Sequence, residues 1–417
     1  MMSRIIFHVD VNSAYLSWEA TYRLQHGETL DLRTIPSAIG GNPKKRHGII
    51  LTKSIPAKKY KIKTGESLME AYKKCPNLHV VAPNYALYMK CSNALTDIFK
   101  EYFHKIDRYS IDESFLDFTN MEHILGPPVE FAYFLKNRIK KELGFTVSVG
   151  ISSNKLLAKM ASDMKKPDAV TTLFPDEIKE KMWPLPIEDL FMVGRATSPK
   201  LRRMGIHTIG DIAKMDHQLI KAMLKSHGSM IWNYANGIEY SEVKKNDKLN
   251  IKGIGNSTTI SFDVTNEKEA LMFILSLCET VTTRLRESGY IARTVVISIK
   301  TNTFNHWSHQ CKLNFATNNT TKIFQAAKKL FRESWNKEPI RHLGVRVTDF
   351  EPGEFVQLNL FDDDTEKQEK LDKVIDDLRN RFSSKAISRG CFANSDIKGM
   401  IGGVGDEDDY PMMRSLL

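Results

Sequence analysis

The pattern of apolar residues changes twice along the chain, and these changes limit the folds that the chain can adopt. Up to about residue 174, short β-branched runs alternate with amphipathic segments, which predicts a mixed sheet backed by helices. From Asp176 to Tyr240 only short helical segments remain, separated by glycines. Residues 241–250 are polar and without periodicity, which predicts a linker. A chain of 417 residues is also too long for one compact core, so we expect several domains.

The predicted elements beyond the linker follow the order βαββαβ. Strands and helices are expected, in this order, near Gly253–Phe262, Glu267–Glu287, Ile291–Thr301, His309–Phe315, Thr321–Trp335 and Leu343–Phe350. This is the order of the split βαβ or ferredoxin-like domain. After Phe350 an acidic patch precedes one more predicted helix, whose apolar residues share a face: Leu371, Val374, Ile375, Leu378 and Phe382.

The charge balance favours a polyanionic partner. Lysine and arginine number 60 against 50 aspartates and glutamates, a net charge of +10. Basic residues concentrate between Lys44 and Lys74, where the acidic residues are only Glu66 and Glu70. A charge run of this kind, taken alone, is usually a solvated surface.

The cysteines and the N-terminus exclude two classes of protein. The 5 cysteines are widely spaced and odd in number, without a CxxC pair, so we expect reduced thiols and no structural zinc site. The first residues contain only a short apolar run, and no apolar stretch reaches the length needed to cross a membrane. We therefore expect a cytoplasmic protein that is neither exported nor membrane-spanning.

Three carboxylates stand where strands are predicted to begin or end. Asp10 follows an apolar run, and Asp112 and Glu113 are adjacent in the segment SIDES. Carboxylate oxygens suit two divalent ions about 3.5–4 Å apart, which neutralise charge in phosphoryl and nucleotidyl transfer. Neighbouring side chains of a regular strand point to opposite faces, so we predict a turn or bulge at this pair. Read alone, Asp10 fits a helix cap equally well, and the pair fits a polar hairpin tip.

Three segments together resemble a known family: FHVDVNSAYLSWEA, YSIDESFLDF and TVSVGISSNKLLAKMASDMKKPDAV. They resemble the signature segments of Y-family DNA polymerases, which include bacterial DNA polymerase IV and the catalytic subunit of DNA polymerase V. The resemblance extends from the first strand to at least Phe350. It implies an α+β multidomain, right-hand polymerase that performs error-prone translesion synthesis in the response to DNA damage, including the SOS response. No segment remains for a proofreading exonuclease.

The resemblance also implies a domain order. The family's palm, which is discontinuous, falls on residues 1–31 and 75–174, and its fingers fall on residues 32–74. The remaining parts follow in sequence: a helical thumb at 175–240, a linker at 241–250, a βαββαβ little finger at 251–350 and a C-terminal tail at 351–417.

The family's catalytic residues fall on matching positions of this chain. Its metal-binding carboxylates fall on Asp10, Asp112 and Glu113, and its backbone-carbonyl ligand falls on Val11, which implies two Mg²⁺ ions. The aromatic residue that excludes ribonucleotides falls on Tyr15, five residues after Asp10. Asn12 replaces an aspartate that is frequent in DNA polymerase IV and in this respect resembles DNA polymerase V.

The residues implied to bind the incoming deoxynucleoside triphosphate are Thr52, Lys58 and Lys159. Lys159 is also expected on the polar side of a helix that follows a Ser-Ser-Asn turn, a setting that suits an anion. Two positions depart from the family: Ile55 stands where DNA polymerase IV has a tyrosine, and Lys58 replaces an arginine. A lysine is a point charge and not a bidentate fork, so the phosphates would be held differently.

Two further segments point to macromolecular partners. EDLFMVGRATSPKLRRMGIHTIGDIAKM resembles a helix-hairpin-helix, which would place Gly194, Arg195 and Lys200 on the backbone of primer-template DNA. An ordinary helical turn with surface lysines is the alternative. QLNLF at 357–361 resembles the peptide that binds the bacterial β sliding clamp, through Gln357, Leu358, Leu360 and Phe361. A short edge strand packed on the protein itself would also explain it.

Two other functions fit part of the sequence. A noncatalytic DNA-binding and clamp-binding scaffold would use only the helix-hairpin-helix and QLNLF. A metal-dependent nuclease would use the same carboxylates but has no need of Tyr15. An accessory subunit, as for DNA polymerase V, is a further partner that the resemblance allows.

Overall fold

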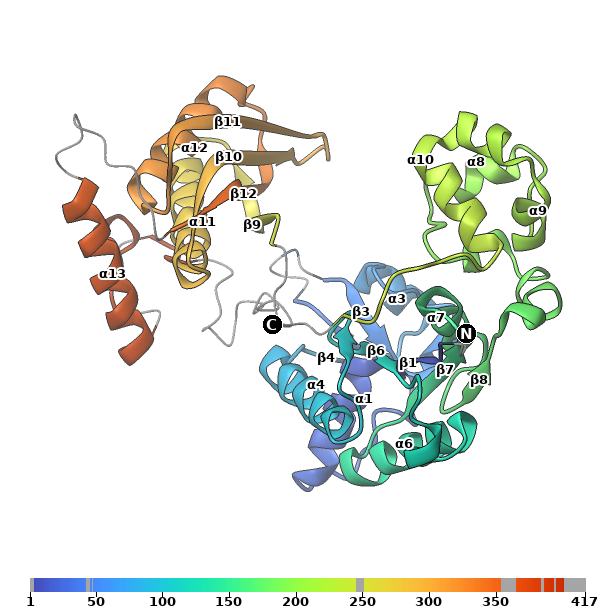
Figure 1. The fold of residues 1–417 in the computed structure, drawn as a ribbon. Helices are drawn as coiled ribbons and strands as arrows, with labels where there is room; N and C mark the ends of the chain where they lie inside the picture. Colours follow the sequence, from blue (N-terminus) through green and yellow to red (C-terminus); the bar gives the residue numbers. More distant parts are fainter. Residues whose placement is uncertain are drawn as a thin grey trace.

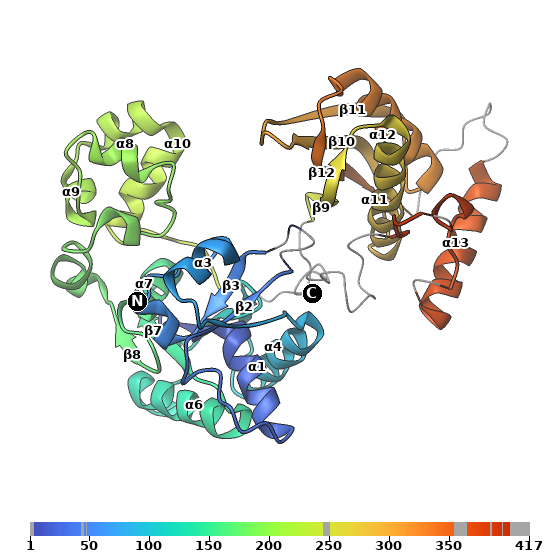
Figure 2. The same ribbon diagram turned by 180° about the vertical axis from the view of Figure 1, so that it is seen from behind.

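The chain forms three parts in space, seen in a computed structural model (Figure 1). The structure describes residues 4–42, 46, 48–244, 251–353, 365–383, 386–393 and 395–400. The N-terminal part lies between a helical unit on one side and a C-terminal sheet unit on the other, and the view from behind agrees (Figure 2). The multidomain α+β organisation that the sequence predicts is confirmed.

A five-stranded sheet is the centre of the N-terminal part, in the order β5-β6-β1-β7-β8. Its middle strand is antiparallel to both neighbours, β6 and β7. The strands are β1 (Ile6–Val11), β5 (Ile106–Arg108), β6 (Glu113–Asp117), β7 (Val147–Ser152) and β8 (Val170–Thr172). Every residue of β1 and of β7 is buried, as expected for strands covered on both faces.

Helices cover the two faces of this sheet unequally. Phe7, Val9 and Val11 of β1 belong to the core shared with three helices: α1 (Ala14–Gln25), α4 (Tyr85–Lys100) and α6 (Pro128–Leu143). The short helix α5 (Glu122–Leu125) precedes α6. The opposite face, which carries His8 and Asp10, is covered by α7 (Lys155–Met164).

Gly150 of β7 allows α7 to approach the sheet closely. A Cβ atom at this position would lie 1.9 Å from the carbonyl oxygen of Ala158 and 2.4 Å from the amide nitrogen of Ser162. Gly150 is also the register partner of His8 in β1. The absence of a side chain here therefore brings the middle of α7 directly over His8.

A small sheet of three strands, β3-β2-β4, extends the N-terminal part. Its strands are β2 (Ser37–Gly40), β3 (Ile50–Lys53) and β4 (His79–Val81), and it carries the helices α2 (Ile55–Lys58) and α3 (Leu68–Lys74). β4 pairs in parallel with β2. This unit therefore continues past residue 74, where the sequence analysis ended it, because a three-residue strand has too little alternation to be recognised.

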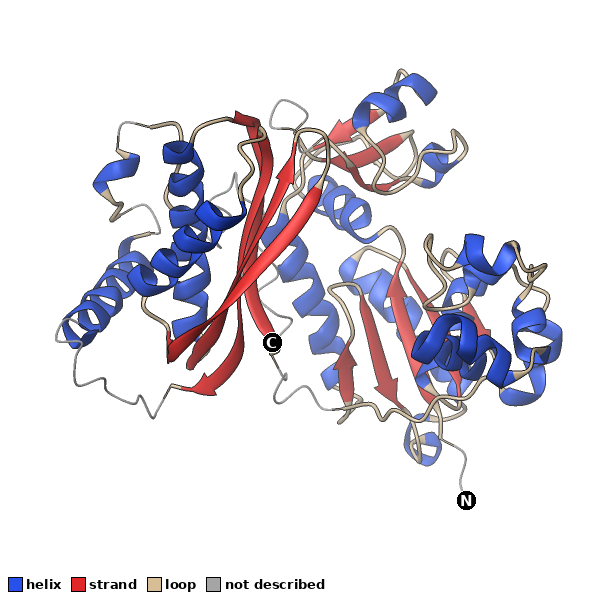
Figure 3. Cartoon of the chain, turned by 90° about the horizontal axis from the view of Figure 1, so that it is seen from above, coloured by secondary structure: helices blue, strands red, loops and turns tan. Residues whose placement is uncertain are grey.

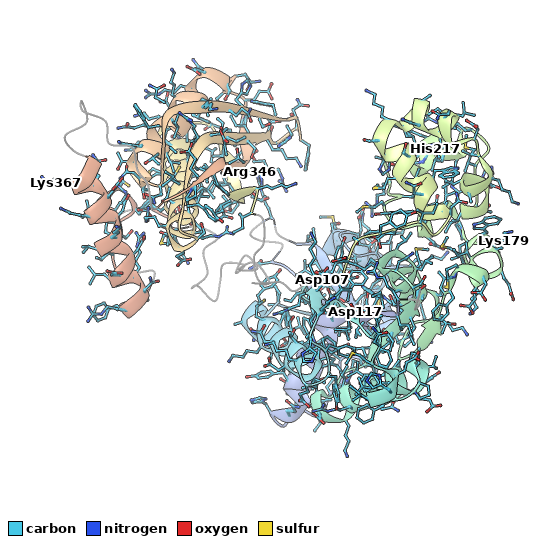
Figure 4. The ribbon with its side chains drawn as sticks, viewed as in Figure 1. Asp107, Asp117, Lys179, His217, Arg346 and Lys367 are labelled. Atoms are coloured by element: carbon cyan, nitrogen blue, oxygen red, sulfur yellow. The ribbon has the colours of Figure 1, made fainter. Side chains whose placement is uncertain are left out.

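The helical unit follows β8. It consists of short helical turns and three helices: η2 (Pro175–Glu177), η3 (Ile178–Met182), η4 (Ile187–Asp189), α8 (Ser198–Arg202), α9 (Ile209–Lys214) and α10 (His217–Ala235). Its core includes Leu156, Leu157 and Met160 of α7, so the unit packs on the same helix that covers the central sheet. Lys179 and His217 mark this unit in Figure 4.

The C-terminal unit has the predicted βαββαβ order. It contains β9 (Gly253–Val264), α11 (Glu267–Glu287), β10 (Tyr290–Thr301), β11 (His306–Thr317), α12 (Thr320–Ser334) and β12 (Ile340–Pro352). The sheet order is β11-β10-β12-β9 with antiparallel neighbours, which interlocks two split βαβ units. Both helices lie on one face of the sheet, and no described helix of this unit covers the other face (Figure 3).

The last helix, α13 (Thr365–Phe382), packs through its polar side. Asp372 and Arg379 are buried, whereas Leu371, Val374 and Phe382 are exposed. The predicted apolar face therefore exists, but it is not the face that contacts the C-terminal unit. Ion pairs position the helix instead, since Arg286 of α11 contacts Asp376 at 2.5 Å.

Candidate active site

Two of the predicted carboxylates are direct neighbours across two strands. Asp10 of β1 is the register partner of Glu113 of β6, so both side chains lie on the face of the sheet that α7 covers. Asp112 precedes β6 in a bend, and its carbonyl oxygen accepts a hydrogen bond from the amide of Val11 at 3.1 Å. The predicted distortion is therefore present, and it frees Asp112 from the alternation of a regular strand.

Asp10 is held by a lysine. It is buried, and burial raises its pKa to about 7, although the nearby Lys166 ammonium opposes this shift. Lys166 Nζ lies 2.9 Å from Asp10 Oδ2. Because the pKa of Asp10 stays high even beside Lys166, a further cation would still stabilise its ionised form.

Glu113 is held from two sides. Lys159 Nζ lies 2.6 Å from Glu113 Oε1, and His8 Nε2 lies 3.8 Å from Glu113 Oε2. Burial alone would raise the pKa of Glu113, but the contacts with His8 and Lys159 outweigh burial and lower it. Glu113 is therefore ionised over the working range of most enzymes.

The imidazole of His8 is completely buried behind Glu113. Its Nδ1 lies 2.7 Å from Ser162 Oγ, and that hydroxyl donates to the carbonyl oxygen of Lys159 at 2.8 Å. Since the hydroxyl proton is used there, we infer that His8 Nδ1 donates. Burial lowers the pKa of His8, and within the described chain Nε2 has no hydrogen-bond partner. The sequence analysis missed His8 and Ser162, because a buried histidine gives no signal in a single sequence.

Asp112 has a different partner. Ser110 Oγ donates to Asp112 Oδ1 at 2.6 Å, while burial raises the pKa of Asp112. Each of the three carboxylates is thus engaged with its own neighbour. Accordingly, no three histidine, cysteine, aspartate or glutamate side chains of the described residues surround a common point closely enough to hold an ion.

The donor set nevertheless fits divalent metal ions. Asp10 and Glu113 lie opposite each other on one sheet face, Asp112 borders the same cavity as Asp10, and carboxylate oxygens are the ligands that Mg²⁺ prefers. Burial, together with the nearby carboxylates of Glu113 and Asp112, raises the pKa of Asp10 to about 7, and a cation beside it would favour the ionised form.

A cavity of about 620 Å³ opens beside Asp10 and Asp112. Other side chains around it come from α1, from β3 and α2, and from the segment after α7, among them Tyr15, Thr52, Ile55, Lys58 and Lys166. The cavity therefore combines carboxylates, an aromatic ring and four basic side chains, those of Arg33, Lys53, Lys58 and Lys166. Glu113 and Lys159 are not among the residues around it.

Tyr15 is fixed at the cavity by other aromatic rings. Its ring stacks on Tyr88, with centroids 4.6 Å apart and planes 9° from parallel, and makes an edge contact with Tyr85 at 5.9 Å. Tyr15 is half-buried, so one side of the ring borders the cavity. The stack gives Tyr15 a fixed position, which a ring that only filled space would not need.

The lysine that the resemblance implies at the triphosphate is not the lysine that borders the cavity. Lys159 was predicted to bind the triphosphate, but it contacts Glu113 and lies away from the cavity. Lys166, which the sequence analysis passed over, borders the cavity together with Lys58. Its signal was weak, since it is the second of two adjacent lysines just after a helix.

Asn12 is engaged by polar side chains of the sheet. Its Oδ1 accepts a hydrogen bond from Ser148 Oγ at 2.9 Å, and its Nδ2 donates to Thr146 Oγ1 at 3.1 Å. An asparagine at this position therefore ties β1 to β7.

Gly194, Arg195 and Lys200 are exposed on the helical unit. A Cβ atom at Gly194 would meet nothing within 4 Å, and positive φ occurs instead at Met192. The backbone freedom expected of Gly194 is thus not used. Arg195 shares a hollow with Lys63, Lys73 and Lys74 of the three-stranded unit.

Two predictions stand apart from the site. The clamp-binding peptide at 357–361 lies outside the described residues, as do Lys44 and Lys45 of the basic run. Among the helices that the structure describes, none is long and apolar enough to cross a membrane.

Three family models match the chain. The impB/mucB/samB family matches residues 9–163, its C-terminal domain matches residues 251–360, and the HHH motif of the IMS family matches residues 175–206. Together these matches cover more than half of the chain and all three of its parts.

Similar proteins carry one name. DNA polymerase IV of Clostridium acetobutylicum is 47% identical over 399 residues, which cover 95% of this chain and 100% of that protein. DNA polymerase IV 1 of Bacillus subtilis is 36% identical, with 93% of each chain covered. The fold is similar to a solved Y-family DNA polymerase chimera, Dbh-Dpo4(243-245)-Dbh, with a TM-score of 0.72 and 20% identity over 85% of this chain and all of that one.

Proposed function

The chain belongs to the impB/mucB/samB family of Y-family translesion DNA polymerases, and from this we propose that its chemistry takes place at Asp10, Asp112 and Glu113. It is a DNA-directed DNA polymerase that carries out translesion synthesis. The observation that carries the residue assignment is the pairing of Asp10 with Glu113 on one sheet face, next to Asp112 and the cavity. A noncatalytic scaffold and a nuclease are not favoured, since relatives at 47% identity are polymerases.

We assign two Mg²⁺ ions to the three carboxylates and the carbonyl oxygen of Val11. Bound there, the ions would lower the pKa of the primer 3′-hydroxyl and neutralise the triphosphate. The contribution of the chain is to hold the carboxylates at the ends of adjacent strands, with Asp112 released from strand geometry by its bend. Asp10 is buried and Asp112 and Glu113 are partly buried, which strengthens their electrostatic effect.

The cavity is the proposed site of the deoxynucleoside triphosphate. Thr52, Lys58 and Lys166 offer a hydroxyl and two cations around it, which suits a polyanion. Lys58 and Lys166 together would supply the charge of the arginine that the family carries at the position of Lys58. Tyr15, fixed by its stack on Tyr88, would meet a ribose 2′-hydroxyl and so exclude ribonucleotides.

The other parts are proposed to hold primer-template DNA. We assign the N-terminal sheet as palm, the three-stranded unit as fingers and the helical unit as thumb, with Gly194, Arg195 and Lys200 at the DNA backbone. The C-terminal unit would be the little finger. Its open sheet face carries Lys300, Lys312 and Arg346, by their alternation with buried neighbours in the strands (Arg346 is labelled in Figure 4).

Two partners beyond DNA and nucleotides are proposed from sequence alone. Residues 357–361 would bind the bacterial β sliding clamp, and an accessory subunit would be needed only if the purified chain is inactive. Since the substrate is chromosomal DNA, the place of action would be the cytoplasm.

Primer extension by the purified protein tests the proposal. With Mg²⁺, a primed template and all four deoxynucleotides, we expect extension that the β clamp increases and that EDTA abolishes. The clamp effect should disappear in Leu360→Ala and Phe361→Ala, which leave extension without the clamp unchanged. No extension by the wild-type protein, with and without the clamp, would remove the catalytic assignment or require the accessory subunit.

The two lysines can be separated by nucleotide affinity. Lys166→Met is expected to raise the KM for deoxynucleotides about 10-fold, since a charge-assisted contact is lost. An unchanged KM in Lys166→Met would show that Lys166 does not contact the nucleotide and that other basic side chains around the cavity supply the charge.

A further inference from the structure

Lys159 is a nearly buried cation whose nearest anion is a carboxylate of the active site. The residue is 9% exposed, and its Nζ lies 2.6 Å from Glu113 Oε1. It does not border the cavity where the triphosphate would lie. A lysine this buried needs a compensating anion, and Glu113 is that anion.

Two aromatic rings complete the surroundings of this ammonium group. Lys159 Nζ lies 5.4 Å from the ring centre of Tyr109 and 5.6 Å from that of Phe191, both within cation–π range. The two rings also touch each other, with centroids 6.2 Å apart, and Phe191 stacks on Tyr234 of α10. We call Tyr109 and Phe191 the aromatic cage.

The helix that carries Lys159 is itself held in place. The Asn154 side chain caps α7 by accepting from the amide of Leu157 and also donates to the carbonyl oxygen of Gly237 at 2.9 Å. Near its other end, Ser162 contacts the buried His8. Lys159 therefore has little freedom to leave Glu113 for a ligand in the cavity.

Resting on the proposed role of Glu113 as a metal ligand, we propose that Lys159 is a positioning residue that takes the place of the metal ion on Glu113 until an ion binds. In the metal-free protein the ammonium neutralises the carboxylate and holds it toward α7. An arriving ion competes with that ammonium for the same carboxylate. The cage sets the strength of the competition, because it stabilises the ammonium beside Glu113.

Loss of Lys159 should change the stability and the metal affinity in opposite directions. Without Lys159, Glu113 is a partly buried carboxylate that has lost its ammonium partner, so the metal-free protein becomes less stable and the affinity for a divalent ion rises. A lysine that bound the triphosphate would instead leave metal affinity unchanged and weaken nucleotide binding.

The test measures Mn²⁺ binding by electron paramagnetic resonance and thermal unfolding in EDTA and in MnCl₂, without DNA or nucleotide. Lys159→Met should lower the Tm in EDTA and bind Mn²⁺ about 10-fold more tightly, a change of the size that outer partners of metal ligands produce. Its gain in Tm with MnCl₂ should therefore exceed that of the wild type.

Lys155→Met is the matched control. Lys155 lies on the same helix, contacts Asp107 at 2.6 Å and lies 4.8 Å from the ring centre of Phe115. Its carboxylate partner is not a proposed metal ligand. This variant should therefore lose a comparable ion pair and cation–π contact without a change in Mn²⁺ affinity.

Phe191→Leu tests the cage without changing any charge. It should raise Mn²⁺ affinity in the same direction as Lys159→Met but by about 2–3-fold, since one weak cation–π contact is lost. This variant also decides the question if Lys159→Met does not fold. Mn²⁺ affinity that is unchanged or weaker in the folded variants would overturn the proposal, and a weaker dATP affinity in Lys159→Met would return Lys159 to the triphosphate.

Glu113→Gln separates this proposal from the metal assignment. If Glu113→Gln binds Mn²⁺ as the wild type does, Glu113 is not a ligand and the proposed function fails. If Glu113→Gln loses binding while Lys159→Met and Phe191→Leu bind as the wild type does, only the role of Lys159 fails.

Discussion

Buried charges are used differently in the N-terminal sheet and in the C-terminal unit. At the active site, Asp10 and Glu113 each have one lysine at close distance, and Asp112 has a serine. Between α11 and α13, by contrast, Arg286 makes a two-point contact with Asp376, at 2.5 and 2.9 Å, and also donates to the carbonyl oxygen of Asn318. Asp372 adds bonds from Asn319 and Thr320.

We infer that the charges at the active site serve the chemistry, whereas the charges between α11 and α13 stabilise the structure. A buried ion pair with every donor and acceptor engaged resists disruption, because each partner would be left uncompensated. A carboxylate with a single cationic partner can exchange that partner for another cation. We therefore expect opposite outcomes when the two kinds of site are mutated.

The largest effect is expected at the carboxylates of the active site. Asp112→Ala or Glu113→Ala should lower primer extension by a factor on the order of 10³ or more, since charge neutralisation by a metal ion contributes several kcal/mol to the transition state. Primer-template affinity, measured by fluorescence anisotropy, should stay within about twofold, because the DNA contacts that we propose lie on other parts of the chain.

Asp117→Ala is the matched control for these variants. Asp117 lies on the same strand and the same face as Glu113, at the opposite end, and pairs with the exposed Lys105. Figure 4 labels it together with Asp107. Extension by Asp117→Ala should match that of the wild type, and equal losses in Asp117→Ala and Glu113→Ala would mean that the strand and not the metal ligand was damaged.

The next effect is one of stability and concerns Arg286. Arg286→Met leaves Asp372 and Asp376 buried without their cation, so the free energy of unfolding of the C-terminal unit should fall by about 3–5 kcal/mol. Urea unfolding followed by circular dichroism measures it. Extension by the folded protein should be retained on a short primed template.

Lys329→Met on α12 is the control for Arg286→Met. Its pair with Glu333 spans 3.9 Å between two exposed side chains, so its loss should change the free energy of unfolding by less than about 0.5 kcal/mol. If both variants lose a similar free energy of unfolding, the buried network contributes no more than a surface ion pair. The ion pairs between α11 and α13 would then have no special structural role.

The fold and the positions of the carboxylates could be predicted from the sequence, because both produce local patterns of residues. The βαββαβ order follows from alternation and helical periodicity, and Asp10 and Glu113 lie at ends of apolar runs. Which side chains meet in space could not be predicted as well from the sequence. The pairing of Lys159 with Glu113 depends on the close approach of α7 at Gly150, which involves residues far apart in the sequence.

The helix α13 shows a second reason why sequence patterns fall short. Its apolar stripe predicts a buried face, yet ion pairs bury Asp372 and Arg379 instead. A pattern of apolar residues reveals which side chains share a face, but not which partners the rest of the chain offers. Here Arg286 and Glu279 of α11 are those partners.

A third prediction concerns packing that serves selectivity. Tyr15→Ala should raise the incorporation of ribonucleotides relative to deoxynucleotides by a factor on the order of 10², since a steric contact worth a few kcal/mol is lost. Tyr88→Leu removes the stack beneath Tyr15, worth about 0.5–1.5 kcal/mol, together with the contacts of Tyr88 to Trp18, Tyr85 and Glu19, and should raise the same ratio by about 10-fold or less.

Single-nucleotide incorporation with matched deoxynucleotides and ribonucleotides measures both variants. Phe273→Leu, a core substitution in the C-terminal unit, should leave the ratio unchanged while lowering stability. If Tyr15→Ala keeps the wild-type ratio, the stacked rings are core packing only, and the N-terminal sheet loses this functional feature.

The smallest effect is expected where the two regions touch. Arg46 Nη1 lies 2.6 Å from Asp263 of β9, and both side chains are partly exposed, so Arg46→Ala should cost at most about 1 kcal/mol. The contact lowers the pKa of Asp263, chiefly through its hydrogen bond with Arg46. A lowered carboxyl pKa adds stability above the pKa of an unfolded aspartate, and this stability is lost as pH falls toward the folded pKa. We therefore expect the Tm values of the wild type and Arg46→Ala to differ at pH 7 in low salt and to become equal near pH 3 or in 1 M NaCl. Tm values in these three conditions measure the difference, and a gap that persists in 1 M NaCl would mean that Arg46 joins the regions by packing and not by charge.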